Sequence, residues 1–199
     1  MIGTVRRGPF HNFLSLALAA LLALPACSGL PAPSPSMAVP LYFQTPLEAV
    51  GFSRISHSVE ISAFLHQAAG HDGQARVEVL GLSVEGQPIE ALVLPARGSA
   101  AAPSVPLRVM IVGSQHGAAE PAGGEALLVV VRELLQGSLQ ELREHLELIL
   151  IPNANPDGRD LQRRSNARRV NINTDFIAAS QPETQALRMA LLRFRPDVL

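Results

Sequence analysis

Apolar positions between residues 58 and 199 alternate between helical spacing and short strand-like runs. Residues 58–69 carry apolar side chains close to helical spacing, and Ser58 stands where an N-cap is expected, so this segment predicts a helix. Residues 76–82 and 87–94 alternate or run apolar and are joined around Glu85-Gly86, which is a turn signal. These two segments predict a β-hairpin.

The same alternation continues towards the C-terminus. Residues 109–112 predict a buried strand, and a helical pattern over 126–135 follows Gly123 and Gly124. Strands alternating with helices predict an α/β domain whose mixed sheet is flanked by helices. The remaining predicted segments are a short helical connection at 139–145, a strand at 147–151, a polar loop at 153–173, a helix at 183–194 opened by Pro182, and the start of a strand at 196–199.

The first 41 residues have a different character. Two arginines precede an apolar run at 13–24, which is too short to span a bilayer comfortably and is typical of an export signal. The run ends at Leu24-Pro25-Ala26-Cys27, which resembles the lipobox of bacterial lipoproteins, whose cysteine carries the lipid. We therefore expect a lipoprotein signal peptide over 1–26, lipidation at Cys27, a flexible Pro/Ser/Ala-rich tether over 27–41, and a folded domain over 42–199. The alternative is an ordinary signal peptide cleaved near Ala26.

Composition narrows the possible partners. The formal net charge is -1 and aromatic residues make up 4% of the chain, so nothing indicates nucleic acid as a partner. The single cysteine excludes an internal disulfide framework. The expected location is outside the cytoplasm, on a bacterial membrane through the lipid on Cys27, facing the periplasm or the cell exterior.

Candidate chemistry begins directly after the 109–112 strand. His116 and Glu120 lie on the turn between this strand and the next helix, and such turns lie at the carboxyl edge of an α/β sheet, where ligands usually bind. A neutral imidazole and a carboxylate are two of the ligand types that zinc accepts in a catalytic site. Taken alone, a His near a Glu is more often a surface hydrogen bond.

Two further motifs follow in order, PNANPDG at 152–158 and VNINTDF at 170–176. Together with the His–Glu turn they resemble the zinc carboxypeptidase superfamily, the M14 metallopeptidases, and above all its exported bacterial members. The resemblance covers roughly residues 107–199. It implies a carboxypeptidase-like (phosphorylase/hydrolase-like) fold, a Zn²⁺ cofactor, and hydrolysis of peptide or related amide bonds.

Carried over by this resemblance, His116 and Glu120 are the first two zinc ligands. The family usually has two residues between them, whereas this chain has three, Gly117 to Ala119. Aligning from His116 would put Ala119 at the ligand position; aligning from Pro121 keeps Glu120, since a turn can absorb one residue. Glu125 is a weaker candidate, expected to be a solvated helix residue.

The resemblance also assigns substrate contacts. Arg164 matches the arginine that polarises the scissile carbonyl and stabilises the oxyanion, and Asn173 matches an asparagine that holds the terminal carboxylate of the substrate. The next family position is an arginine, but here it is Thr174, which cannot grip a carboxylate bidentately. Arg168 and Arg169 are the candidates to replace it. We expect Asp157 to form a turn, and we expect the other histidines of the domain to be structural or exposed: His57, His66, His71 and His145.

The family pattern continues past the position of Leu199 with a second histidine ligand and a glutamate that activates water. We therefore expect an incomplete domain, the N-terminal portion of a longer enzyme, which is inactive by itself and leaves a sheet edge and apolar surface exposed. The alternatives are a non-catalytic exported lipoprotein that serves as a binding or scaffold module, and an N-acyl amino acid deacylase of the same fold.

Overall fold

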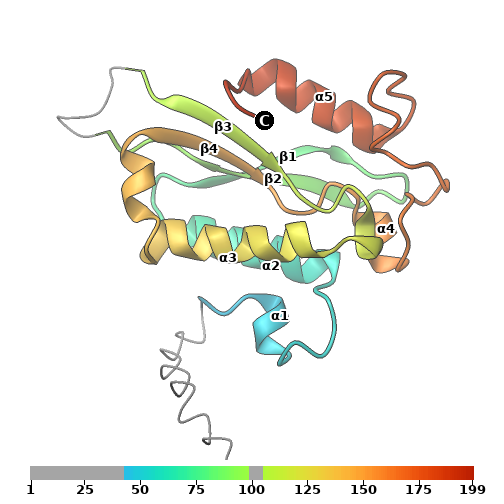
Figure 1. Ribbon diagram of the computed structural model, residues 1–199, viewed down its shortest axis with the longest axis horizontal. Coiled ribbons are helices and arrows are strands. Elements are labelled where there is room, and N and C mark those ends of the chain that lie inside the picture. The colour runs from blue at the N-terminus through green and yellow to red at the C-terminus, as the bar shows by residue number, and fades with distance from the viewer. Residues whose placement is uncertain (1–42, 99–104) are drawn as a thin grey trace, which may run out of the picture. The chain divides into compact units, whose positions relative to one another are not determined.

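The computed structural model describes residues 43–98 and 105–199 (Figure 1). The expected signal peptide, Cys27 and the whole of the expected tether lie outside the described residues. Within the described part, no helix is long and apolar enough to cross a membrane.

A four-stranded mixed sheet forms the centre of the fold (Figure 1). The strands stand in the order β1-β2-β4-β3, with two antiparallel pairs and a parallel β3–β4 pair. The predicted hairpin and the mixed α/β sheet are therefore confirmed. The strand bounds are Arg76–Leu82 for β1, Pro88–Leu94 for β2, Leu107–Val112 for β3 and Leu146–Ile151 for β4.

The central strands bury both of their faces, which explains why β2 and β4 read as nearly continuous apolar runs. Successive side chains point to opposite faces. One apolar cluster contains Leu92, Leu94, Leu148 and Leu150. The other contains strand residues that point to the opposite face: Ile89, Ala91, Val93, Ile149 and Ile151.

Helices cover the two faces unequally. The helices α2 (Ser58–His71) and α3 (Ala122–Gln136) pack together on one face, whereas α5 (Pro182–Phe194) lies on the other (Figure 1). Their apolar sides complete the two clusters, with Leu128 and Val131 of α3 in the first and Leu187 of α5 in the second. The predicted helix opened by Pro182 is confirmed. The short elements are α1 (Pro46–Ala49), α4 (Pro156–Asp160), and the 3₁₀ helices η2 (Gly117–Ala119) and η3 (Gln140–Glu144).

Three local predictions need correction. The N-cap of α2 is His57 rather than Ser58, because Ser58 uses its hydroxyl on Pro156 O and on Asp160 Oδ1, at 3.1 and 3.0 Å. Helix α3 begins at Ala122, so both glycines of the pair lie inside it. The long polar loop contains α4, where the side chain of Asn155 caps the helix by accepting from Gly158 N.

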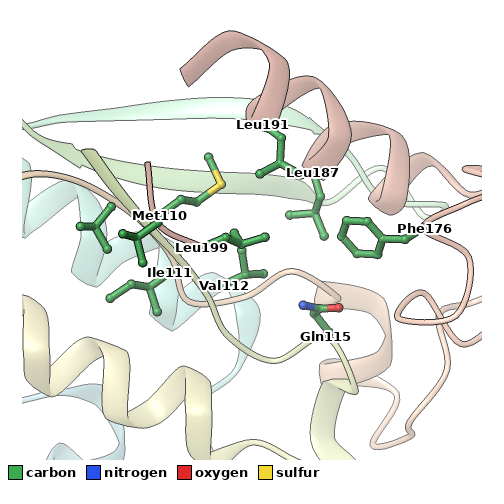
Figure 2. A pocket seen from close by; sticks show the side chains of 10 residues that line it. Met110, Ile111, Val112, Gln115, Phe176, Leu187, Leu191 and Leu199 are labelled. Atoms are coloured by element: carbon green, nitrogen blue, oxygen red, sulfur yellow. The ribbon is translucent and has the colours of Figure 1, made fainter. Parts of the chain in front are cut away.

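The last residues run beside β3. Met110 N donates to Val198 O at 2.9 Å, and Val198 forms a parallel bridge with Val109, so the predicted strand at 196–199 is present as a single bridge. Beside this bridge lies an apolar cavity of about 480 Å³ (Figure 2). Its wall combines β3, α5 and the chain end, as the labelled side chains of Ile111, Leu187 and Leu199 show.

Candidate metal and substrate site

The predicted His–Glu turn follows β3 at the carboxyl edge of the parallel strand pair. Residues 113–120, here called the His116 turn, close through η2, with His116 at its start and Glu120 at its end. The three residues between them form the 3₁₀ helix, so the additional residue is absorbed without separating the pair. Nδ1 of His116 lies 2.7 Å from Oε2 of Glu120.

Arg164 joins this pair from a different part of the chain. It lies on the loop after α4 (residues 161–170, here called the Arg164 loop), and its guanidinium donates to His116 Nε2 at 3.0 Å and to Glu120 Oε1. A guanidinium can only donate, so Nε2 of His116 accepts and the ring proton is assigned to Nδ1, which donates to Glu120. Three of the residues that the resemblance singles out thus contact one another.

The site is open to solvent on one side. The side chain of His116 is 13% exposed, whereas those of Glu120 and Arg164 are 58% and 50% exposed. Hydrogen bonds from His116 and then from Arg164 hold the pKa of the Glu120 carboxyl below its usual value. The histidine is therefore held against the turn, while the carboxylate and the guanidinium face the solvent.

Asn173 lies beside His116 and Glu120. It lines a groove of about 320 Å³ together with His116 and Glu120. Thr174 is exposed, but its hydroxyl donates to Asn171 O at 3.0 Å. Neither Arg168 nor Arg169 is among the described residues that line this groove.

The donor atoms of these residues show how far the site suits a zinc ion. His116 Nε2 and Glu120 Oε1 carry lone pairs, and both are directed at one cationic group, the guanidinium of Arg164. The pair therefore converges on a position that accepts a cation, and its donor types suit zinc. Nowhere in residues 43–98 and 105–199 do three His, Cys, Asp or Glu side chains cluster in a way that could hold a metal ion. His116 and Glu120 therefore suit two positions of a zinc site that has further ligands.

The structure corrects the expectation for Glu125. This residue is 7% exposed, not solvated, and its carboxylate accepts from Ser56 N and Ser56 Oγ at 2.8 and 2.7 Å. It also pairs with Arg159, 2.9 Å away. Helix α3 begins earlier than predicted, which turns this position inward. Glu125 therefore does not face the groove.

Asp157 is structural, but it does more than form a local turn. It is fully buried in α4 and accepts from Ser83 Oγ at 2.6 Å and from Glu85 N at 3.0 Å. These donors lie on the turn of the β1–β2 hairpin, so Asp157 ties that turn to the segment that leads to Arg164.

The remaining histidines are structural or exposed, as expected. His57 is close to Asp160 at 3.7 Å, His66 contacts Glu90 at 3.0 Å, and His71 packs edge-on against Phe43. His145 is exposed. None of them lines the groove that contains His116.

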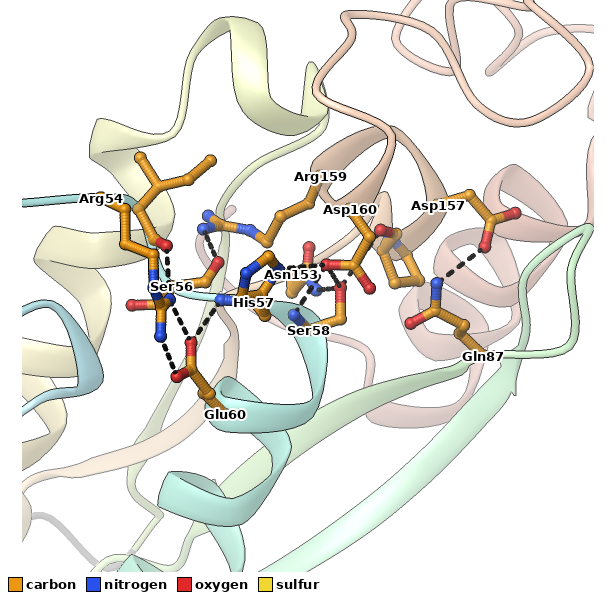
Figure 3. Close-up of polar contacts among 12 residues, drawn as sticks. Arg54, Ser56, His57, Ser58, Glu60, Gln87, Asn153, Asp157, Arg159 and Asp160 are labelled. Carbon is orange, nitrogen blue, oxygen red and sulfur yellow. Dashed lines mark hydrogen bonds and ion pairs between the residues drawn. The ribbon is translucent and has the colours of Figure 1, made fainter. Parts of the chain in front are cut away.

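Sequence reasoning missed Ser56, Ser114 and Arg159. All three are buried, with Ser114 at the start of the His116 turn, and Figure 3 shows Arg159 directed at Ser56. Two of them stand directly beside recognised signals, since Arg159 follows the PNANPDG motif and Ser114 follows Gly113. No local pattern distinguishes a buried arginine from a solvated one.

Known proteins share both the sequence and the fold. The Peptidase M14 zinc carboxypeptidase profile matches residues 61–192. A probable carboxypeptidase 2 of Trichophyton verrucosum is 31% identical over 94 residues, which are 46% of this chain and 18% of that protein. Carboxypeptidase SOL1 of Arabidopsis thaliana is 28% identical over 128 residues, which cover 57% of this chain and 26% of that protein.

Among solved structures, the metallo-carboxypeptidase from Burkholderia cenocepacia matches with a TM-score of 0.58 and 27% identity, over 70% of this chain and 38% of that chain. The metallo-carboxypeptidase from Pseudomonas aeruginosa, solved in complex with (2-guanidinoethylmercapto)succinic acid, gives a TM-score of 0.57 and 26% identity over 72% and 38%. The chain thus spans less than half of each of these relatives. With the profile covering most of the described domain, the chain belongs to the zinc carboxypeptidase family, Peptidase M14.

Proposed function

We propose that this chain carries part of the site of a zinc-dependent, metallocarboxypeptidase-type hydrolase that acts on peptide or related amide bonds. The observation that carries the proposal is the convergence of His116, Glu120 and Arg164, which come from segments 44 residues apart and contact one another. Membership of the zinc carboxypeptidase family supports the same reading.

In this proposal His116 and Glu120 hold the zinc ion. When bound, zinc acts as a Lewis acid and makes water a competent nucleophile near neutral pH. Arg164 donates its N–H groups to the oxyanion that develops on the scissile carbonyl, where a preorganised charge is most effective. Its side chain, half exposed, has room to leave His116 and Glu120 for that position.

Asn173 would bind the terminal carboxylate of the substrate through its amide. Thr174 would add little, because its hydroxyl already donates to Asn171 O. An arginine at that position would grip the carboxylate with two parallel hydrogen bonds. We therefore propose a weaker requirement for a free C-terminal carboxylate, and related amides such as N-acyl amino acids should be tested beside peptides.

Catalysis needs groups that the described residues do not supply. Residues 43–98 and 105–199 contain no third metal-binding side chain near His116 and Glu120. A catalytic zinc site generally has three protein ligands. We propose that the third ligand and the general base come from outside the described residues in the complete enzyme, and that the described part is inactive without them.

Zinc titration tests the proposal directly. The full chain should bind about one equivalent of zinc by calorimetry, and His116→Ala should abolish binding. The matched control is His66→Ala, because His66 also contacts a carboxylate, Glu90, at 3.0 Å but lies away from the groove. Arg164→Ala should leave zinc binding intact or strengthen it, since Arg164 occupies the cation position in the structure.

One observation favours a non-catalytic binding module instead. Both oxygens of Glu120 and both ring nitrogens of His116 are already satisfied by hydrogen bonds within the site. If the wild-type chain takes up no zinc, or if His66→Ala weakens binding as much as His116→Ala does, the hydrolase proposal is abandoned in favour of this module.

For the location, we propose export and membrane anchoring through a lipid on Cys27, which lies outside the described residues. The support is the lipobox-like segment that ends at the only cysteine of the chain. Cys27→Ser should move the protein from the membrane fraction to the soluble exported fraction. A variant that stays in the membrane fraction would contradict the lipid anchor.

A further inference from the structure

A buried polar network joins Ser114, at the start of the His116 turn, to buried residues of other segments. Its members are exposed by 7% or less, namely Ser56, Ser114, Glu125 and Arg159. Burying a charged pair is costly unless its hydrogen bonds are well formed. The hydrogen bonds of this network therefore indicate which segments it holds together.

Arg159 is the centre of the network. Its guanidinium donates to Ser56 O at 2.9 Å, to Glu125 Oε1 at 2.9 Å and to Ser114 Oγ at 2.6 Å. Glu125 returns to Ser56 by accepting from its backbone N–H and its hydroxyl. Figure 3 shows the contact between Arg159 and Ser56 beside the start of α2. One arginine thus ties together three segments that are distant in sequence.

Three members of the network lie close in sequence to residues of the candidate site. Ser114 precedes His116 by two residues, Glu125 follows Glu120 by five, and Arg159 precedes Arg164 by five. The guanidinium of Arg159, in the helix that leads into the Arg164 loop, is therefore bonded to the start of the His116 turn and to the first turn of α3 that follows it.

The backbone at Ser114 indicates that this attachment holds the turn in place. Ser114 has a φ of 52°, a left-handed conformation that a residue with a side chain adopts at a cost. Its Oγ is held by Arg159, and a Cβ at the neighbouring Gly124 would stand 2.2 Å from that Oγ and 2.8 Å from Arg159 Nη2. A strained residue two positions before His116 is thus fixed from both sides.

We propose that Arg159 is a positioning residue, which sets His116, Glu120 and Arg164 in their mutual geometry by holding Ser114 and Glu125. This inference rests on the proposed function, but the geometry of the three side chains can be measured without zinc. When Arg159 is replaced, we expect the side chains of His116, Glu120 and Arg164 to lose their mutual geometry, in addition to any loss of stability of the fold.

The chain offers a matched control. Arg143 is as deeply buried as Arg159 and pairs with a buried carboxylate, that of Asp72. It lies just before β4 begins, at the opposite end of this strand from the candidate site. Arg143→Met therefore removes a comparable buried ion pair without touching the His116 turn.

The experiment compares Arg159→Met with Arg143→Met in the full chain, by two measurements. The ¹⁵N chemical shifts of the His116 ring report the tautomer and its hydrogen bonds, and calorimetry reports zinc affinity. For Arg159→Met we expect the ring signals to move towards those of a free, tautomerically mixed imidazole, and zinc affinity to fall by about 10-fold or more. Arg143→Met should leave both unchanged, although it lowers stability.

If Arg159→Met does not fold, Ser114→Ala takes its place, because it removes only the hydroxyl that Arg159 holds. The inference would be overturned if Arg159→Met and Arg143→Met changed the ring shifts and the zinc affinity alike. It would also be overturned if Ser114→Ala left both quantities at their wild-type values. If the wild-type chain binds no zinc, the proposed function fails, and the ring shifts alone then decide whether Arg159 positions His116.

Discussion

At the scale of single residues, the His116 turn depends on one glycine. Gly117 has a φ of 50°, which residues with side chains rarely adopt, and a Cβ there would stand 2.5 Å from Arg163 O and from Gly158 C. The turn therefore packs directly against the backbone of α4 and the start of the Arg164 loop. This close approach is what allows Arg164 to reach His116.

Gly117→Ala should therefore destabilise the protein and disturb the site. The left-handed backbone alone costs about 1–2 kcal/mol, and the backbone clash adds to it. Urea unfolding measures the loss of stability, and zinc calorimetry measures the effect on the site. The matched control is Gly70→Ala in α2, where a Cβ meets nothing within 4 Å and should stabilise by roughly 0.5–1 kcal/mol. Equal effects of the two changes would refute the steric explanation.

At the scale of elements, the start of α2 supports α4. Ser58 donates from its backbone and its hydroxyl to Asp160, and His57 N donates to Glu60 at 2.7 Å (Figure 3). Arg54 also pairs with Glu60, at 2.6 Å. The Ser58 contacts join the N-terminus of α2 to the helix that carries Arg159, and the Glu60 contacts hold the chain at the start of α2.

Glu60 makes the start of α2 dependent on pH. Hydrogen bonds, above all from Arg54, lower the pKa of Glu60 from 4.5 to about 2. A carboxyl with a lower pKa in the folded state stabilises the fold fully above the unfolded pKa. That contribution is lost as pH falls from about 4.5 towards about 2.

We predict that Glu60→Gln lowers the free energy of unfolding at pH 7 by about 0.5–1 kcal/mol, since this ion pair is partly exposed. The same change should make the decline of stability below pH 4.5 shallower. Urea unfolding at several pH values checks both. Glu141→Gln is the control, because Glu141 is an exposed residue of η3, away from the start of α2. A wild-type acid profile in Glu60→Gln would contradict the prediction.

At the scale of the whole domain, the side of the sheet beyond β3 is incompletely covered. Within the part of the chain that the structure describes, the outer side of β3 is bridged only through Val109 to Val198. Ile111 and Leu199 remain 39% and 71% exposed beside the apolar cavity (Figure 2). An open strand edge next to apolar surface favours association with other chains.

We therefore predict that the chain self-associates as its concentration rises, and that Leu199→Lys reduces this association. Sedimentation velocity over a concentration series measures the effect. Val59→Lys is the matched control, since Val59 is 73% exposed on α2, away from this edge. A wild-type chain that stays monomeric throughout, or an equal response to both changes, would show that this apolar surface does not drive association.

How far the sequence predicts this protein depends on the range of the interactions involved. The hairpin, β3, β4 and α5 follow from local periodicity and turn residues, because strand alternation and helical spacing are properties of neighbouring residues. The ordered motifs predict four site residues: His116, Glu120, Arg164 and Asn173. The structure places three of them around one groove, and Arg164 contacts His116 of that groove.

The sequence by itself thus determined the alternation of strands and helices, the mixed sheet and the motif residues that meet beside it. Only the tertiary structure decided that Glu125 is buried, that Arg159 joins three segments, and that η2 absorbs the additional residue before Glu120. The physical reason is distance along the chain. Ser56 and Glu125 are 69 residues apart, and Arg159 lies 45 residues from Ser114, so no local pattern records the hydrogen bonds that bury them.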